Sequence, residues 1–207
     1  MDFDVTQISD CVIVSSEVSP AGAINLIGHC WDAVLELLHN GLMCQGYITK
    51  GLIYHSDSQV IGSGYQKAYS RESEVSAFKH EADERGTPFV EVDPIVCAYI
   101  RKCDDKCVKE MFSRMVKSDG EVTVLFPFKR LSHSFRLAGF GVKFDPQKEK
   151  QANQNVRLRL NRLKGQIIEF VDKSNPSAVK KAEYYIKALN AQLEACNKTD
   201  KIIDMFS

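Results

Sequence analysis

Apolar and polar positions follow two different periods along the chain, one typical of strands and one typical of helices. In the segment VTQISDCVIVSS, residues 5–16, β-branched and apolar residues stand on both sides of Ser9-Asp10. Ser and Asp favour turns, so the pattern predicts two short strands joined by a hairpin turn. Asp10 is then either a simple turn residue or a ligand at the hairpin tip, and the pattern alone leaves both open.

The next segment has the period of an amphipathic helix. Ser19-Pro20 has the residues of an N-cap and a first helical position, and Asn40-Gly41 has those of a helix stop. Between them the apolar positions recur every three or four residues, at Ile24, Ile27, Trp31, Val34 and Leu38. One helix is therefore expected between the two signals.

The middle of the chain mixes both periods. Residues 42–64 are rich in Tyr, Ile, Val and Thr and are interrupted at residues 55–58, which predicts strand, turn and strand. Residues 65–84 contain helix-forming residues, and residues 87–93 form the short apolar run of a strand.

A second hairpin signal follows. Asp119-Gly120 separates the apolar runs of residues 111–117 and 122–131, and Asp-Gly between such runs is typical of a tight hairpin turn. Strands interleaved with helices of this length predict an α+β fold, with helices packed on one face of a mostly antiparallel sheet.

The last quarter of the chain is helical by pattern. Two stripes alternate steps of three and four residues, one from Val156 to Phe170 and one from Val179 to Cys196. Asn175-Pro176 between them fits a helix cap followed by a first-turn proline. We therefore divide the chain into a first domain at residues 1–145 and an antiparallel helical hairpin at residues 146–207.

The composition of the chain excludes several classes of protein. The chain has 207 residues, of which 44% are hydrophobic, enough for one domain and an appendage. No apolar run approaches the ~20 residues of a membrane span, and no signal peptide is evident, so we expect a cytoplasmic protein without a membrane partner. Seven scattered cysteines favour free thiols. Lys+Arg and Asp+Glu both number 27, which makes a nucleic-acid partner unlikely for the chain as a whole.

The charge is nevertheless uneven. Residues 146–207 hold 12 basic and 7 acidic residues. Most of this excess comes from one stretch without acids, which contains Lys150, Arg157, Arg159, Arg162 and Lys164. A solvated helix face is the favoured interpretation, and a surface for phosphate or a partner is the alternative.

The first domain also carries a resemblance. The aspartate-bearing hairpin and its helix are followed by a Gly-rich strand pair that leads into a helix with the pattern G-x-x-Y-Q-x-A-Y-x-x-E. The matching residues are Gly62, Tyr65, Gln66, Ala68, Tyr69 and Glu72. In the order, spacing and type of these elements, residues 5 to 130 resemble a class III nucleotide cyclase domain, most closely the bacterial pyrimidine cyclases of the Pycsar antiphage system.

The resemblance implies a fold and an activity. The fold would be a ferredoxin-like cyclase-homology sheet, acting as a homodimer because family active sites form between two protomers. The reaction would convert UTP or CTP to the 3′,5′-cyclic monophosphate and pyrophosphate, a second messenger for a separate effector in phage defence. Mg²⁺ or Mn²⁺ would be the cofactor. The alternative is a degenerate, non-catalytic module for nucleotide binding or dimerisation.

The resemblance also assigns a metal ligand. Asp10 matches the second of two metal-binding carboxylates. The first is expected on an earlier strand, in a segment that no residue before Asp10 matches. Two explanations compete: either the sequence starts inside the domain, which we favour, or this is a reduced relative that has lost the metal pair.

Further site residues come from the helix after the Gly-rich strands. Gln66 stands where the family has an asparagine that holds the ribose, and Ser70 stands where it has a phosphate-binding arginine. Arg71, or Lys50 on the preceding strand, is expected to reach the phosphates instead, although an ion pair with Glu72 or Glu74 is an equal alternative for Arg71.

The same helix carries two tyrosines. Tyr65 and Tyr69 are candidates for base stacking in nucleotide binding, with packing at an interface as the alternative.

Overall fold

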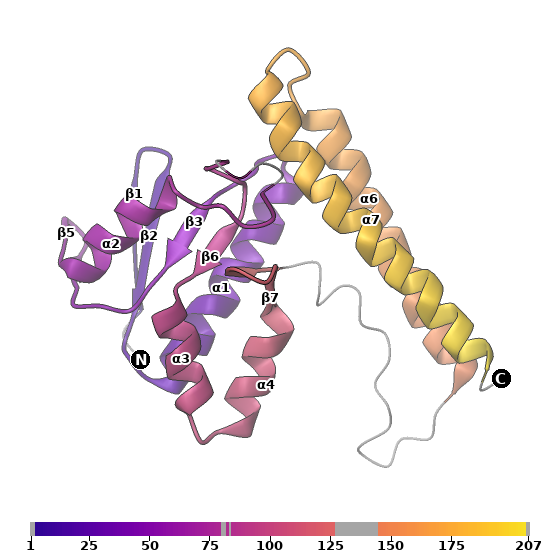
Figure 1. Cartoon of the computed structure of the whole chain (residues 1–207), viewed down its shortest axis with the longest axis horizontal. Coiled ribbons are helices and arrows are strands. Elements are labelled where there is room, and N and C mark those ends of the chain that lie inside the picture. Colours follow the sequence, from indigo (N-terminus) through magenta and orange to yellow (C-terminus); the bar gives the residue numbers. More distant parts are fainter. Residues whose placement is uncertain (1–2, 80–81, 83, 127–144, 206–207) are drawn as a thin grey trace. The chain divides into compact units, whose positions relative to one another are not determined.

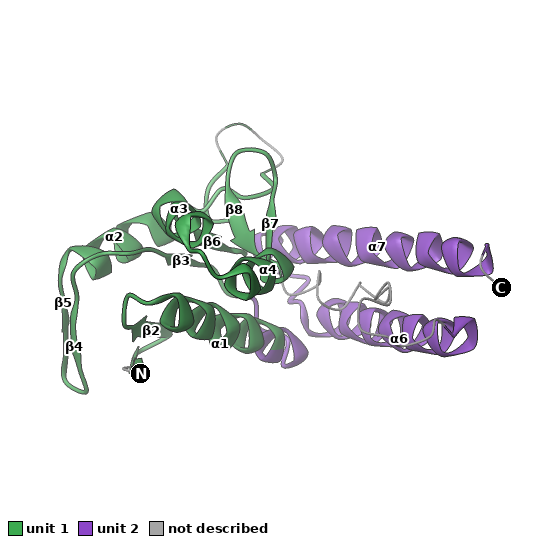
Figure 2. Ribbon diagram, turned by 90° about the horizontal axis from the view of Figure 1, so that it is seen from below, with its two compact units in different colours: residues 1–35, 44–126 green, residues 36–43, 127–207 purple. Residues whose placement is uncertain are grey.

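The structure is a computed structural model, and it describes residues 3–79, 82, 84–126 and 145–205 (Figure 1). It is a mixed α/β protein, as the sequence predicts. The chain divides into two compact units (Figure 2), the first formed by residues 1–35 and 44–126 and the second by residues 36–43 and 127–207. Within the described ranges, no helix combines the length and the apolar character that crossing a membrane requires.

The predicted first hairpin is present. Strands β1 (Phe3–Ile8) and β2 (Cys11–Ser16) pair antiparallel and form a two-stranded sheet of their own. Ile8 pairs with Cys11, so Ser9 and Asp10 are the two loop residues, and Ser9 has a left-handed backbone with φ 56°. This loop matches the expected Ser-Asp turn.

Helix α1 (Pro20–His39) begins and ends where the sequence predicts. The Ser19 hydroxyl accepts a hydrogen bond from the N–H of Gly22, which caps the first turn. Gly41, at φ 77°, follows the helix in the left-handed region that glycine adopts readily. All five of the expected apolar positions are buried.

The central sheet has four short strands. Its order is β3-β6-β8-β7, with β3 and β6 parallel and the other two pairings antiparallel. The strands are β3 (Gly46–Ile48), β6 (Val90–Val92), β7 (Val116–Ser118) and β8 (Thr123–Leu125). The β7–β8 hairpin turns at the predicted Asp-Gly pair. The predicted extension of β8 beyond residue 126 lies outside the described residues.

A third small sheet consists of β4 (Tyr54–Ser56) and β5 (Gln59–Ile61), which form the hairpin expected around residues 55–58. His55 joins this hairpin to the first one, because its Nδ1 lies 2.7 Å from the Ser15 hydroxyl and its Nε2 lies 2.9 Å from the Thr6 hydroxyl. The expected strands are thus present, but they are divided over three small sheets. The ferredoxin-like arrangement stays a prediction.

The remaining helices of the first unit are α2 (Ser63–Glu72), α3 (Pro94–Lys102) and α4 (Lys106–Met115). Helix α2 ends twelve residues before the predicted limit of residue 84, since residues 73–79 form turns and irregular structure. The sequence analysis missed α3 and α4, and residues 111–115, which were interpreted as a strand, belong to α4. Aspartates cap both missed helices.

The core of the first unit lies between helices and the central sheet. Side chains of α1, α3 and α4 meet those of β6, β7 and β8 in one buried cluster, in which Ile27, Trp31, Ile100 and Leu125 are almost fully inaccessible. This packing fixes β6 and the start of α3, which together carry the site described below.

The second unit contains the predicted helical hairpin. Helices α6 (Pro146–Phe170) and α7 (Pro176–Asp204) are antiparallel in both views (Figures 1 and 2). Asn175 caps α7 by accepting hydrogen bonds from two N–H groups, as expected. The stripe residues Leu160, Leu163 and Leu189 are buried.

Candidate functional site

The candidate site begins where the parallel strands β3 and β6 end. Thr49 directly follows β3 and Asp93 directly follows β6, so both lie at the same edge of the sheet. The Thr49 hydroxyl donates a hydrogen bond of 2.7 Å to Oδ2 of Asp93. In open α/β sheets, the carboxyl ends of parallel strands are the usual place for a ligand.

Asp93 is a buried carboxylate with three donors. Its side chain is 5% exposed, and Lys67 Nζ lies 2.6 Å from Oδ2. The N–H of Ile95 donates to Oδ1 at 3.0 Å, which makes Asp93 the N-cap of α3. Burial alone would raise the pKa of Asp93, but the hydrogen bonds from Ile95, Lys67 and Thr49 outweigh it and lower that pKa. The carboxylate is therefore ionised and joins β3, α2 and α3.

Two further cations stand on the segments that meet at this carboxylate. Arg71 is one helical turn after Lys67, and its guanidinium carbon lies 5.8 Å from the centre of the Tyr47 ring on β3. Lys50 follows Thr49, and its Nζ lies 4.6 Å from the ring centre of Tyr99 on α3. We call Lys50, Lys67 and Arg71 the cationic cluster. Asp93 and Glu91 are both buried, and the charges of Glu74 and Glu91 act on Arg71, so carboxylates partly balance these three cations. The exposed ammonium and guanidinium groups of the cluster can still attract an anionic ligand.

Arg71 has two partners. A hydrogen bond to the Tyr47 hydroxyl raises the pKa of Arg71, and its Nη1 lies 2.6 Å from a Glu74 carboxylate oxygen. Both groups of the Arg71–Glu74 pair are about half exposed. The alternative expected from the sequence, an ion pair with a nearby glutamate, is thus present, and at the surface such a pair contributes little to stability.

Helix α2 rests on the body through polar contacts and a close backbone approach. It has no buried residue. Gly51 and Gly64 cross so closely that a Cβ on Gly51 would lie 2.7 Å from the Gly64 Cα. Gly62, at φ 134°, begins the helix in a backbone region that other residues rarely adopt. The Gly-rich pattern of the sequence therefore has a steric cause here.

The structure brings together only part of the predicted site. Lys50 and Arg71 lie in the cationic cluster, but Lys67 was not among the predicted residues. Gln66 is exposed and stands five residues before Arg71, which places the two about 140° apart around the helix. A signal for Lys67 existed in the sequence, since Lys67 and Arg71 are spaced to share one helix face.

The two tyrosines occupy another side of α2. Their ring centres are 6.0 Å apart, and Tyr69 is 68% exposed. Within one chain Tyr69 is therefore not a packing residue. By helical geometry, Tyr65 and Tyr69 lie on the flank opposite Lys67, so one nucleotide cannot readily contact both flanks of a single copy.

Asp10 is exposed at the tip of the first hairpin. Burial raises the pKa of the neighbouring Cys11 thiol, and the negative charges of Glu72 and Asp10 raise it further, so Glu72 lies within electrostatic range of this tip. Among the described residues, no group of three or more His, Cys, Asp or Glu side chains is placed to hold a metal ion. The metal role of Asp10 stays a prediction.

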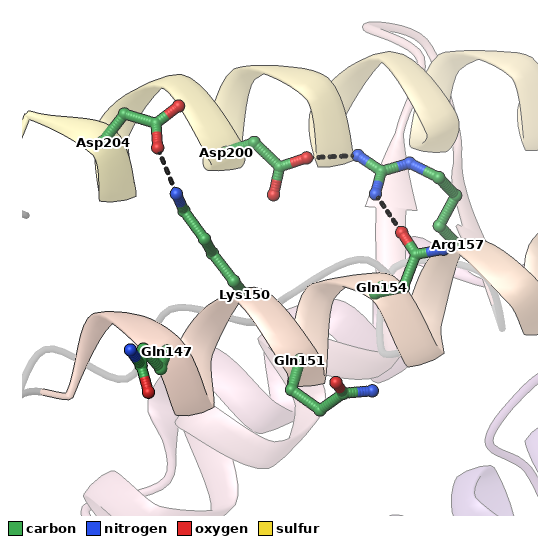
Figure 3. A pocket seen from close by; sticks show the side chains of 7 residues that line it. All are labelled: Gln147, Lys150, Gln151, Gln154, Arg157, Asp200 and Asp204. Carbon is green, nitrogen blue, oxygen red and sulfur yellow. Dashed lines mark hydrogen bonds and ion pairs between the residues drawn. The ribbon is translucent and has the colours of Figure 1, made fainter.

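A polar cavity of about 500 Å³ lies between the ends of α6 and α7 in the second unit (Figure 3). The two cations that line it are already paired with carboxylates. Lys150 Nζ lies 2.5 Å from Asp204 Oδ1, and Arg157 Nη2 lies 2.5 Å from Asp200 Oδ2. Arg157 also donates to Gln154 (Figure 3). Part of the basic stretch thus serves to join the two helices, and this cavity is a weaker candidate than the cationic cluster.

Comparison of the chain with protein-family models, with curated proteins and with solved structures gives no match.

Proposed function

We propose that this chain binds a pyrimidine nucleoside triphosphate, UTP or CTP, as a homodimeric nucleotide cyclase-homology domain. The observation that carries the proposal is the cationic cluster at the carboxyl ends of β3 and β6, with Lys67 and Arg71 on one face of α2. The resemblance of the hairpin and the Gly-rich segment to class III cyclases supplies the nucleotide class.

The cluster suits the triphosphate for reasons of charge and geometry. A guanidinium offers several N–H donors in one plane and an ammonium offers three, so Arg71 and the two lysines can neutralise several phosphate oxygens together. Tyr69 presents an exposed ring on the other flank of α2. A second copy would allow one nucleotide to meet phosphate-binding cations from one protomer and a stacking ring from its partner.

Cyclisation of the bound nucleotide is a second candidate function. In that reaction the ribose 3′ hydroxyl attacks the α-phosphate, a new O–P bond forms, and pyrophosphate leaves with its electron pair while the hydroxyl proton passes to a base. The charges of Asp10 and Glu72, from distant segments, both raise the pKa of Cys11, and two carboxylates within electrostatic range of one hairpin tip favour this candidate. Cations at the phosphates would stabilise the charge that develops.

One experiment separates binding from turnover. The full chain is incubated with each of the four ribonucleoside triphosphates and Mn²⁺, bound nucleotide is measured by equilibrium dialysis, and cyclic product is sought by mass spectrometry. Binding of UTP or CTP without product supports the non-catalytic module, and a cyclic pyrimidine product supports the enzyme. Binding of none of the four nucleotides contradicts the proposal.

A further inference from the structure

Lys67 contacts an internal carboxylate and is at the same time accessible to a ligand. Its ammonium contacts the buried Asp93 carboxylate, yet the Lys67 side chain is 47% exposed. It stands on α2, on the same face as Arg71. We infer that Asp93 competes with phosphate groups for Lys67 and so holds the anion site in a state of lower affinity. This inference rests on the proposed function and adds to it an autoinhibitory contact.

The contacts of Asp93 make the exchange feasible. When Lys67 leaves, the carboxylate still accepts hydrogen bonds from the Thr49 hydroxyl at 2.7 Å and from the N–H of Ile95 at 3.0 Å. Asp93 therefore keeps two donors and its role as helix cap. A buried carboxylate that lost all its donors would oppose the exchange strongly.

The contacts of Lys67 also allow the exchange. A lysine side chain has a flexible four-carbon stem, and no second ion pair or hydrogen bond is found for its ammonium among the described residues. Arg71, in contrast, is held by Tyr47 and by Glu74. Lys67 is thus the member of the cationic cluster that is best able to exchange an internal carboxylate for a polyphosphate.

The Asp93→Asn substitution isolates the competing charge. Asparagine is as good an N-cap as aspartate, and its amide oxygen can still accept from Ile95 or Thr49. The substitution removes the negative charge that attracts Lys67 and turns one acceptor oxygen into an amide donor, which the Thr49 hydroxyl can accept. Glu121→Gln is the matched control. It removes the carboxylate of another ion pair in the same unit, in which Glu121 Oε2 lies 3.0 Å from Lys79 Nζ.

The probe is inorganic tripolyphosphate, titrated calorimetrically without metal ions into the full chain. Asp93→Asn is expected to bind it about tenfold more tightly than the original protein, because a charged hydrogen-bond partner is freed. Lys67→Met is expected to bind it several-fold more weakly. In the double variant Lys67→Met/Asp93→Asn, the gain from Asp93→Asn should disappear, and Glu121→Gln should bind as the original protein does.

Two results would overturn the inference: an affinity of Asp93→Asn equal to or below that of the original protein, or a gain that persists without Lys67. Absence of tripolyphosphate binding by every variant would overturn it as well. Thermal unfolding checks that each variant is folded, and Asp93→Ser, which also caps helices, replaces Asp93→Asn if the latter unfolds. Because tripolyphosphate lacks base and ribose, a failure of pyrimidine recognition leaves this result intact.

Discussion

Asp93 is the residue at which three elements meet, because Thr49, Lys67 and the backbone N–H of Ile95 all donate to its carboxylate. Its position directly after β6 places it at the edge of the sheet and at the start of α3. The same residue therefore caps a helix, holds α2 and balances the cationic cluster.

The lowered pKa of Asp93 predicts a pH dependence of stability. The carboxyl is more acidic in the folded protein than its ordinary value of 3.8, so its ionisation stabilises the fold above that value. This contribution is lost as the pH falls through the lower, folded pKa. Urea unfolding of Asp93→Asn at a series of acidic pH values should therefore show a shallower loss of stability below about pH 4. An unchanged slope would contradict this account, with Glu121→Gln as control.

Asp10 leads to a different prediction at the residue scale. It is exposed in a two-residue turn, so Asp10→Asn should change the free energy of unfolding by no more than about 0.5 kcal/mol. If Asp10 binds a metal ion, the same variant should lose the part of nucleotide binding, and any cyclic product, that depends on Mn²⁺. A folded Asp10→Asn variant that keeps both in full would rule out the metal role.

Helix α2 is held in place by polar contacts and a close backbone approach, and not by buried apolar side chains. It buries no residue, and it meets the rest of the unit through the Lys67–Asp93 pair, the Arg71–Tyr47 contact and the crossing of two glycines. Such a helix is more easily displaced than α1, whose apolar face lies in the core.

The glycine crossing gives a matched pair of substitutions. Gly51→Ala places a Cβ 2.7 Å from a backbone atom of Gly64, so it should destabilise the first unit by about 1–3 kcal/mol. Gly28→Ala in α1 meets nothing within 4 Å and should stabilise the protein by up to about 1 kcal/mol. Thermal and urea unfolding test both. Equal effects of the two variants would show that the crossing is not tight.

Elements with local signals were predictable from the sequence. The three hairpin turns, the limits of α1 and the cap of α7 follow from a few neighbouring residues whose preferences agree. The pairing of β3 with β6 was not predictable, because more than forty residues separate the two strands. Helices α3 and α4 were missed although Asp93-Pro94 and Asp105 are local cap signals of the same kind.

The candidate site was predictable only in part for a related reason. Lys50 and Arg71 were proposed as cations close to the family position that Ser70 occupies, whereas the role of Lys67 depends on a contact with Asp93, 26 positions away. Gln66 was assigned by alignment with a family position, but helix geometry directs it away from Arg71. Contacts between distant segments therefore decide which members of a motif share a face.

At the scale of the whole molecule, the buried leucines of α6 and α7 pack within one hairpin. Their burial therefore gives no argument for a dimer. Apolar side chains of the first hairpin remain more than half exposed, namely Val5, Ile8 and Val12. By the strand register, Val5 and Val12 lie on one face of the hairpin and Ile8 lies on the other. Exposed apolar residues on one face are typical of interaction surfaces.

We predict a two-fold dimer that uses this hairpin. Light scattering at micromolar concentration should report twice the mass of one chain, 23.3 kDa. Val12→Glu should shift the protein toward monomer, because a charge would have to be buried in the interface. Leu158→Glu, at an equally exposed position on α6, is the control. A monomer at all concentrations would contradict the prediction.

The most direct test of the proposed function is a calorimetric titration of the full chain with UTP, CTP and ATP, repeated with Lys50→Met and with Arg71→Met. Arg114→Met, which removes an exposed arginine of α4, serves as control. We expect UTP or CTP to bind more tightly than ATP, and each cluster variant to lose about tenfold in affinity, since each removes one charged partner of the phosphates. Affinities of Lys50→Met and Arg71→Met equal to that of the control would contradict the assignment of the cationic cluster as the nucleotide site.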